Sequence, residues 1–315
     1  MIFQDIEQSY FDRCHKPKEA QACWENFLVE FPPDRLEDYN LRPSLNLAKE
    51  AGDLGLALFW NAQASLIRPL LKAFLPTVEN SETIAMLSGI AKNAVGALAI
   101  SESKDRPLIV TKENGRVRLD GEKKYITGGR YADFLLMTSR STQEEKLSSI
   151  LFLPVCDIQT QAFEDLDLGC LCTSSQARLT LDNYHLPMAN LVSDDTSVIR
   201  KRLRVWGMIE QSIIVEAMTG LTLYLAERVF QDFDKRVQAI GDVEAGLFLL
   251  SGEIDGQIAS AQSGDFVRPL SPISEHLIQA MKDLKTIHEG LQNQMPDELL
   301  YRFKDLFYFS RHLML

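Results

Sequence analysis

The pattern of apolar and polar residues predicts helices in the N-terminal part of the chain. Residues 47–74 mix Ala, Leu, Lys and Glu in a run typical of helices, and Pro69 should kink or split its last turns. A second helical run covers residues 81–93, where Ser81 is a suitable N-cap.

The pattern changes after Val95, where short runs of β-favouring residues alternate with turn residues. Asn114-Gly115 and Asp120-Gly121 supply the positive φ angles of tight turns, so we expect two hairpins close together. The pattern indicates a compact antiparallel domain, a small barrel or sandwich. The expected strands are residues 108–111, 117–119, 125–127, 134–137, 150–153 and 177–181.

The helical pattern returns after Ser193. One long helix is expected at residues 199–230 and two more at 242–262 and 275–292. Helices, then strands, then helices is the order of an α+β protein and not of an alternating βαβ fold, and no Rossmann or P-loop glycine motif occurs. The predicted layout is an N-terminal α-helical domain at residues 1–95, a middle antiparallel β-barrel or sandwich domain at 96–193 and a C-terminal α-helical bundle at 194–315.

Composition and charge narrow the class of protein. The 315 residues are 45% apolar and carry a net charge of −11, which argues against a disordered chain and against nucleic-acid binding through an overall basic field. No run approaches the roughly 18 apolar residues of a membrane span, and the N-terminus lacks the features of a secretory signal. Five cysteines in so long a chain form no disulfide framework. We therefore expect a soluble, cytoplasmic protein.

Metal-ion and hydrolase chemistry find no support in the motifs. The five histidines have no partner at ligand spacing, and Cys170 and Cys172 lack a second pair, so no metal site is expected. A Gly-x-Ser-x-Gly nucleophile motif is absent as well.

Glu210 has the most informative position in the long predicted helix. On a wheel of about 100° per residue it lies in the middle of an apolar stripe, so a carboxylate is expected on the face that should be buried. Burial without a cation raises the pKa of a carboxyl group and makes it a candidate general base. The alternative is that Glu210 pairs with a lysine or arginine across a helix interface. The stripe consists of Leu203, Trp206, Ile213, Ile214, Ala217 and Leu221.

The sequence Tyr125-Ile126-Thr127-Gly128-Gly129 closes one of the expected strands. An aromatic ring, a hydroxyl and two glycines could let a flat cofactor approach the backbone closely. The alternative is a plain strand end, because many hairpins have a similar sequence.

The ordered set of segments resembles the acyl-CoA dehydrogenase superfamily over residues 47–262. Residues 96–102, which end in Ser-Glu, resemble the family's entry into the β domain through a Thr-Glu-Pro motif. Residues 117–140 are similar to the strand pair in which a Gly-x-Lys turn leads to an aromatic-Ile-Thr sequence. Residues 177–187 resemble the exit strand, with its acidic residue and its final proline.

The resemblance implies FAD-dependent α,β-dehydrogenation of an acyl-CoA or acyl-carrier thioester. A carboxylate removes the α-proton while the β-hydride passes to the flavin. Tyr125 would then lie against the isoalloxazine ring, Thr127 would hydrogen-bond near N5, and Ser101 would reach the pyrimidine edge. Ile126 belongs to the same cofactor-binding segment, and Arg236 corresponds to an arginine that meets FAD from a neighbouring subunit.

The resemblance also implies which residue is the base. Most family members take it from a C-terminal segment before a Glu-Gly-Thr signature, which this chain lacks. Members resembling isovaleryl-CoA dehydrogenase place it on the first long helix after the β domain, which here carries Glu210. The helical wheel and the resemblance therefore select the same acid.

The chain departs from the family pattern at several positions, as a divergent and shortened member would. Gln211 stands where an arginine usually follows the glutamate, and the Arg-x-x-Phe-Gly motif is reduced at residues 236–241. A non-catalytic subunit that partners a full-length homologue is therefore the second hypothesis, and flavin-dependent oxygenation is a third. Apolar stripes on the C-terminal helices predict self-association, as a homo-oligomer (dimer or tetramer) or as a hetero-oligomer with a homologue.

Overall fold

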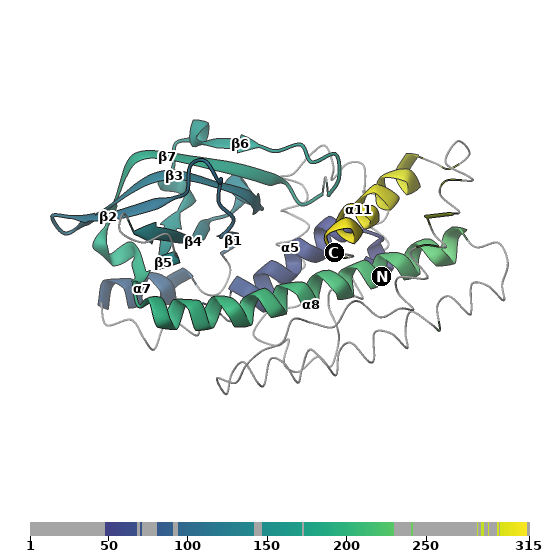
Figure 1. The fold of residues 1–315 in the computed structure, drawn as a ribbon, viewed down its shortest axis with the longest axis horizontal. Coiled ribbons are helices and arrows are strands. Elements are labelled where there is room, and N and C mark those ends of the chain that lie inside the picture. Colours follow the sequence, from purple (N-terminus) through teal and green to yellow (C-terminus); the bar gives the residue numbers. More distant parts are fainter. Residues whose placement is uncertain are drawn as a thin grey trace.

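The computed structural model has an α+β fold in which the long helix α8, Thr196–Val229, runs along one side of a mostly antiparallel sheet and extends past it (Figure 1). The α+β class predicted from the sequence is thereby confirmed. The three-domain layout and the C-terminal bundle stay predictions, because most of the chain between α8 and the last helix, α11 (Asp297–Leu313), lies outside the residues that the structure describes. The residues that the structure describes are 48–67, 70, 81–90, 94–141, 147–171, 173–229, 241, 282, 285–286, 289, 295 and 297–313.

The sheet has eight strands in the order β6-β7-β3-β2-β4-β5-β8, with β1 beside β4. Its pairs are antiparallel except β1 with β4 and β2 with β4. Alternate side chains along β3 and β7 are buried, which is the pattern of a sheet with one face on the core. The strands are β1 Gly96–Ala99, β2 Ile109–Glu113, β3 Arg116–Thr127, β4 Phe134–Ser141, β5 Leu147–Pro154, β6 Phe163–Asp165, β7 Gln176–Pro187 and β8 Leu191–Ser193.

One of the two predicted hairpins exists. Asn114 and Gly115, with φ of 48° and 76°, form the turn between β2 and β3. Asp120-Gly121 forms no turn, so that prediction was wrong: the pair lies inside β3, at a register shift against β7. Gly121 has φ of 137°, and a Cβ there would lie 2.3 Å from the Pro107 carbonyl oxygen. The glycine therefore serves a close backbone contact at a bulge.

The long helix predicted at residues 199–230 is present as α8, which begins slightly earlier and whose start is capped by the Asp195 carboxylate. The first predicted helix is interrupted: α5 starts at the N-cap Asp53, whose carboxylate accepts from the Leu56 N–H at 2.9 Å, and continues as a π-helical segment, η2. The predicted helix at 242–262 lies outside the described residues, as does most of that at 275–292. The described helices are α5 Leu54–Asn61, η2 Ala62–Ile67, α7 Ser81–Ile90, α8 Thr196–Val229 and α11 Asp297–Leu313.

A buried arginine ties the helices together. Arg302 of α11 is 1% exposed, and its Nε donates to the Gly52 carbonyl oxygen at 2.8 Å. Its guanidinium carbon lies 4.9 Å from the centroid of the Tyr224 ring on α8. One turn further along α11, the Asp305 carboxylate accepts from the Leu171 N–H at 2.6 Å. The start of α5, the C-terminal part of α8 and the loop after β6 are thus fixed to α11.

No described helix is both long and apolar enough to cross a membrane.

The bulge in β3 leads to a prediction about stability. Gly121→Ala should destabilise the protein by about 2–4 kcal/mol, because the new Cβ collides with backbone at a φ that side chains rarely adopt. Gly115→Ala is the matched control: it also has positive φ but open space around it, so about 1 kcal/mol is expected. Urea unfolding measures both, and equal losses would contradict the role assigned to Gly121.

Candidate functional site

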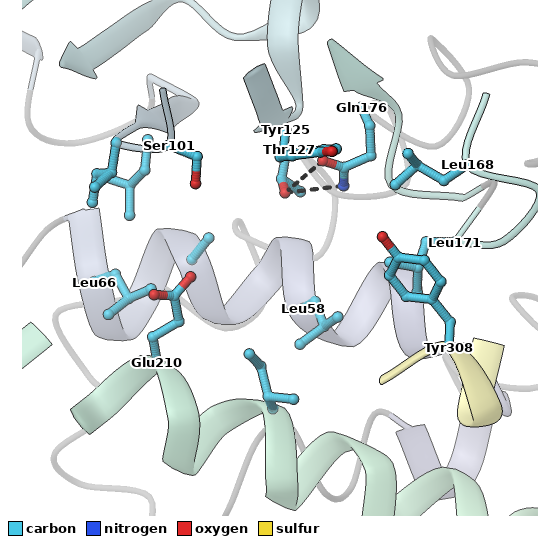
Figure 2. A pocket seen from close by; sticks show the side chains of 14 residues that line it. Leu58, Leu66, Ser101, Tyr125, Thr127, Leu168, Leu171, Gln176, Glu210 and Tyr308 are labelled. Carbon is cyan, nitrogen blue, oxygen red and sulfur yellow. Dashed lines mark hydrogen bonds between the residues drawn. The ribbon is translucent and has the colours of Figure 1, made fainter. Parts of the chain in front are cut away.

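A pocket of about 400 Å³ lies between the sheet, α5 and α8. Its wall is mainly leucine, isoleucine and alanine side chains from α5, η2, β1 and the loop after β6. Figure 2 shows the polar side chains pointing into it from several elements. An apolar pocket of this size with a few convergent polar groups is typical of a small-molecule site. The polar lining residues and tyrosines are Ser101, Tyr125, Thr127, Gln176, Glu210 and Tyr308.

Glu210 projects from α8 into this pocket, across from Ser101 and Thr127 (Figure 2). The residue is exposed by its accessible surface, and its side chain forms part of the pocket wall. Desolvation by the surrounding protein raises the pKa of the carboxyl group above its ordinary value. Within the described residues it has no ion-pair partner, so no salt bridge across a helix interface occupies it there.

Tyr125 lies on the sheet side of the pocket with an unusual backbone. Its side chain is 48% exposed and its φ is 60°, at the second register shift of β3. A positive φ is an outlier for a bulky residue and costs about 1–2 kcal/mol. The irregularity turns the aromatic side chain toward the pocket, while Ile126 beside it is fully buried in the core. Any contact of Ile126 with a ligand in the pocket would go through its backbone.

Thr127 and Gln176 form a polar pair on the pocket wall. The Gln176 Nε2 donates to Thr127 Oγ1 at 3.0 Å, and Thr127 Oγ1 is 3.3 Å from Gln176 Oε1 (Figure 2). β3 and β7 are neighbours in the sheet, and Thr127 faces Gln176 directly in the register. The pair fixes the rotamers of both side chains before any ligand enters.

A buried ion pair holds Ser101 in place. Lys123 is fully buried in β3, and its Nζ donates to the Glu102 carboxylate at 2.9 Å and to the Ile100 carbonyl oxygen at 3.0 Å. The Arg140 Nε donates to the other Glu102 oxygen at 2.6 Å. Both neighbours of Ser101 are therefore anchored. The Ser101 hydroxyl is exposed at the pocket and has no partner among the described residues.

The glycines after Thr127 have a structural role. A Cβ on Gly128 would lie 2.6 Å from the Phe59 ring, and one on Gly129 would lie 2.5 Å from the Ala177 Cβ. Both have positive φ, and neither lines the pocket. They permit close packing within the protein, whereas Tyr125 and Thr127 of the same segment line the pocket. Arg236 lies outside the described residues, so its contact with a cofactor stays a prediction.

Sequence reasoning missed Gln176, Tyr308 and Leu171. Gln176 immediately precedes an expected strand, so the alternation along β7 could have placed it on the same sheet face as other lining residues. Tyr308 comes from α11, far away in the sequence, and no local signal marks it. Leu171 has a positive φ of 53°, and its backbone N–H donates to the Asp305 carboxylate. No group of three or more metal-ligating side chains occurs in the part of the chain that the structure describes.

The comparisons with known proteins find acyl-CoA dehydrogenases and other enzymes of the same fold. No family model matches the chain. Its sequence is 25% identical over 178 residues to acyl-CoA dehydrogenase AFT10-1 of Alternaria alternata, a match that covers 52% of this chain and 39% of that protein. The chain thus matches well under two thirds of that relative's length.

Solved structures share the fold over most of the chain. The prolyl acyl carrier protein oxidase AnaB has a TM-score of 0.68 at 17% identity, covering 97% of this chain and 91% of its own. An FAD complex of PigA has a TM-score of 0.65 at 14% identity, with coverage of 97% and 91%. Butyryl-CoA dehydrogenase from Megasphaera elsdenii has a TM-score of 0.62 at 18% identity, with coverage of 84% and 75%. The chain thus shares the fold of these proteins, and about half of it resembles an acyl-CoA dehydrogenase in sequence.

The ion pair behind Ser101 predicts a pH-dependent stability. Desolvation lowers the pKa of Lys123 from 10.5 to about 8, although Glu102 opposes the shift. Between these values the unfolded chain binds a proton that the folded protein does not, so the contribution of Lys123 to stability rises with pH by about 1.4 kcal/mol per pH unit. Lys123→Met should lack this rise. Urea unfolding of both proteins from pH 7.5 to 10 measures it, and parallel curves would contradict the prediction.

Proposed function

We propose that the protein is a flavin-dependent oxidoreductase that dehydrogenates an acyl thioester, with Glu210 as the catalytic base. The observation that carries the proposal is the convergence of an unpaired carboxylate of raised pKa with Ser101, Tyr125 and Thr127 in one apolar pocket. Four residues selected from the sequence share this pocket. The resemblance to acyl-CoA dehydrogenases supports the reaction class.

The pocket residues fit an isoalloxazine ring. An aromatic side chain with a large exposed fraction and an unpaired hydroxyl lie on the sheet side, across from the carboxylate (Figure 2). Tyr125 would contact the face of the ring, and Ser101 and the Thr127–Gln176 pair would meet its polar edges. The chemistry that FAD supplies when bound is the acceptance of a hydride.

The chain's own contribution is to hold and receive a proton. The α-proton of a thioester is weakly acidic, so its removal needs a base with as high a pKa as the working pH allows. Burial raises the pKa of Glu210, and either carboxylate oxygen can take the proton. The leucine and isoleucine side chains around it exclude water once a substrate fills the pocket, which strengthens the interaction of the carboxylate with the substrate.

The substrate class follows from the relatives. AFT10-1 and the Megasphaera elsdenii enzyme are named as acyl-CoA dehydrogenases, and AnaB as a prolyl acyl carrier protein oxidase. We therefore propose an acyl group in thioester linkage to CoA or to a carrier protein. A pocket of about 400 Å³ that also accepts a flavin ring leaves room for a small acyl group.

The base assignment predicts the behaviour of Glu210→Gln. The variant should retain flavin, judged by the visible absorbance of the purified protein, and should lose dye-coupled dehydrogenation by about 10²–10⁴-fold. The melting temperature of the variant at neutral pH should be higher, because its folded state contains no desolvated carboxylate. In the unsubstituted protein this carboxylate lowers the free energy of unfolding as the pH rises from the ordinary pKa of glutamate through the raised pKa of Glu210. Glu227→Gln, an exposed position on the same helix, is the control.

Two results would count against the proposal. A protein that is colourless and takes up no flavin would exclude a flavin enzyme. A protein that binds flavin but becomes active only when co-expressed with a full-length homologue, with no dependence on Glu210, would instead support the non-catalytic subunit.

The cofactor contact predicts the behaviour of Tyr125→Asn. Asparagine tolerates positive φ better than tyrosine does, so the free energy of unfolding should be unchanged or slightly higher. Loss of the exposed ring should weaken flavin retention by roughly tenfold. Flavin titration followed by fluorescence measures this, with Tyr301→Asn, an exposed tyrosine of α11, as the control. Unchanged flavin affinity would refute a contact between Tyr125 and the ring.

A further inference from the structure

Three adjacent cations mark the second turn of α8. Arg200, Lys201 and Arg202 are exposed, and residues 196–209 contain four basic residues and no acidic one. Helical ion pairs join residues three or four apart, so none of the three can form one with the following turns of α8. In the portion of the chain that the structure describes, no other element pairs with them. A concentrated positive charge in a protein of net charge −11 attracts anions.

Arg200 is the cation on the pocket side of the helix. At about 100° per residue, with Glu210 at 0°, Ile214 lies at about +40° and Arg200 at about +80°. Ile214 and Glu210 both line the pocket, so at their level the pocket lies on this side of α8. Arg202 lies at about −80°, at the other edge, and Lys201 at about 180°, on the reverse of the helix.

The distance from Arg200 to Glu210 matches a particular chemical group. Ten residues of α-helix separate the two positions, which is about 15 Å along the axis. The chain from the phosphorus to the sulfur of 4′-phosphopantetheine has about 13 bonds. It is as long as the backbone of about four extended residues, or roughly 15 Å. A thioester at Glu210 on an extended arm that ran along α8 toward its N-terminus would have its phosphate beside Arg200.

We propose that Arg200 binds the phosphate of a 4′-phosphopantetheine arm whose thioester lies at Glu210. This inference rests on the proposed function, because it takes the acyl thioester as the ligand of the pocket. The planar guanidinium can donate to two phosphate oxygens at once. Lys201 and Arg202 add to the attractive field without contacting the phosphate. CoA and a holo carrier protein both contain this phosphate.

The test is the binding of pantetheine and of 4′-phosphopantetheine to the full chain as purified, by isothermal titration calorimetry. We expect the phosphorylated compound to bind at least about tenfold more tightly at low salt. Arg200→Gln should remove that difference and leave pantetheine binding unchanged. Lys201→Gln and Arg202→Gln remove the same charge from the same turn and should change phosphopantetheine binding by less than about threefold.

Two outcomes would overturn the assignment. One is equal binding of the two compounds to the unsubstituted protein, and the other is an equal loss in Arg200→Gln and Lys201→Gln, which would show a diffuse field without a contact. Binding needs no turnover, so a protein that passes this test but takes up no flavin would fail the proposed function alone. Competition by CoA and by a holo carrier protein then separates the two sources. The competitor whose affinity falls in Arg200→Gln is the one whose phosphate Arg200 binds, and an unchanged affinity of both refutes the site.

Discussion

A carboxylate without a cation in an apolar pocket is the constraint around which the site is arranged. Transfer of a charged group from water into such surroundings is unfavourable, and proteins usually compensate it with an ion pair or with several hydrogen bonds. The described residues give Glu210 neither, and burial alone raises its pKa. A carboxyl group whose pKa is raised by desolvation destabilises the folded protein at neutral pH, to an extent limited here by the surface that Glu210 keeps exposed, and a purely structural residue would not require this. Such uncompensated acids are found where a base is needed.

Two charged side chains near the pocket are fully buried and are compensated, whereas Glu210, which keeps some exposed surface, is not. Lys123 has the Glu102 carboxylate and a backbone carbonyl oxygen within hydrogen-bonding distance. Arg302 donates to backbone carbonyl oxygens and lies on the face of an aromatic ring. These two groups lie behind the pocket walls and hold them in place, one beneath Ser101 and the other where α11 meets α5 and α8. Rigid, compensated surroundings are what allow one uncompensated group to keep its position.

The sequence was informative where a repeating pattern determines the structure. The 3.6-residue period of the long helix located α8 and set Glu210 on its pocket side, and most of the expected strands were found. Gly121 shows the limit: an Asp-Gly pair has the local chemistry of a hairpin turn, and only the approach of the Pro107 carbonyl, fixed by tertiary structure, makes it a bulge. Tyr308 shows another, because its place in the pocket depends on how α11 packs against α5 and α8, and no periodicity within α11 contains that information.

Local irregularities of the backbone gather around the pocket. Of the four non-glycine residues with positive φ in the described part of the chain, two are asparagines, which tolerate that conformation, and the other two, Tyr125 and Leu171, both line the pocket. A third irregularity is the π-helical segment that follows α5, which contributes Ala62 and Leu66 to the pocket wall. Each irregularity costs free energy and persists only because its surroundings enforce it. The Asp305 carboxylate accepts from the N–H of Leu171. In the π-helical segment, the Gln63 side chain bonds both the N–H and the carbonyl oxygen of Gly96. Three independent departures from regular geometry that all shape one cavity are better explained by a bound molecule than by the stability of the fold.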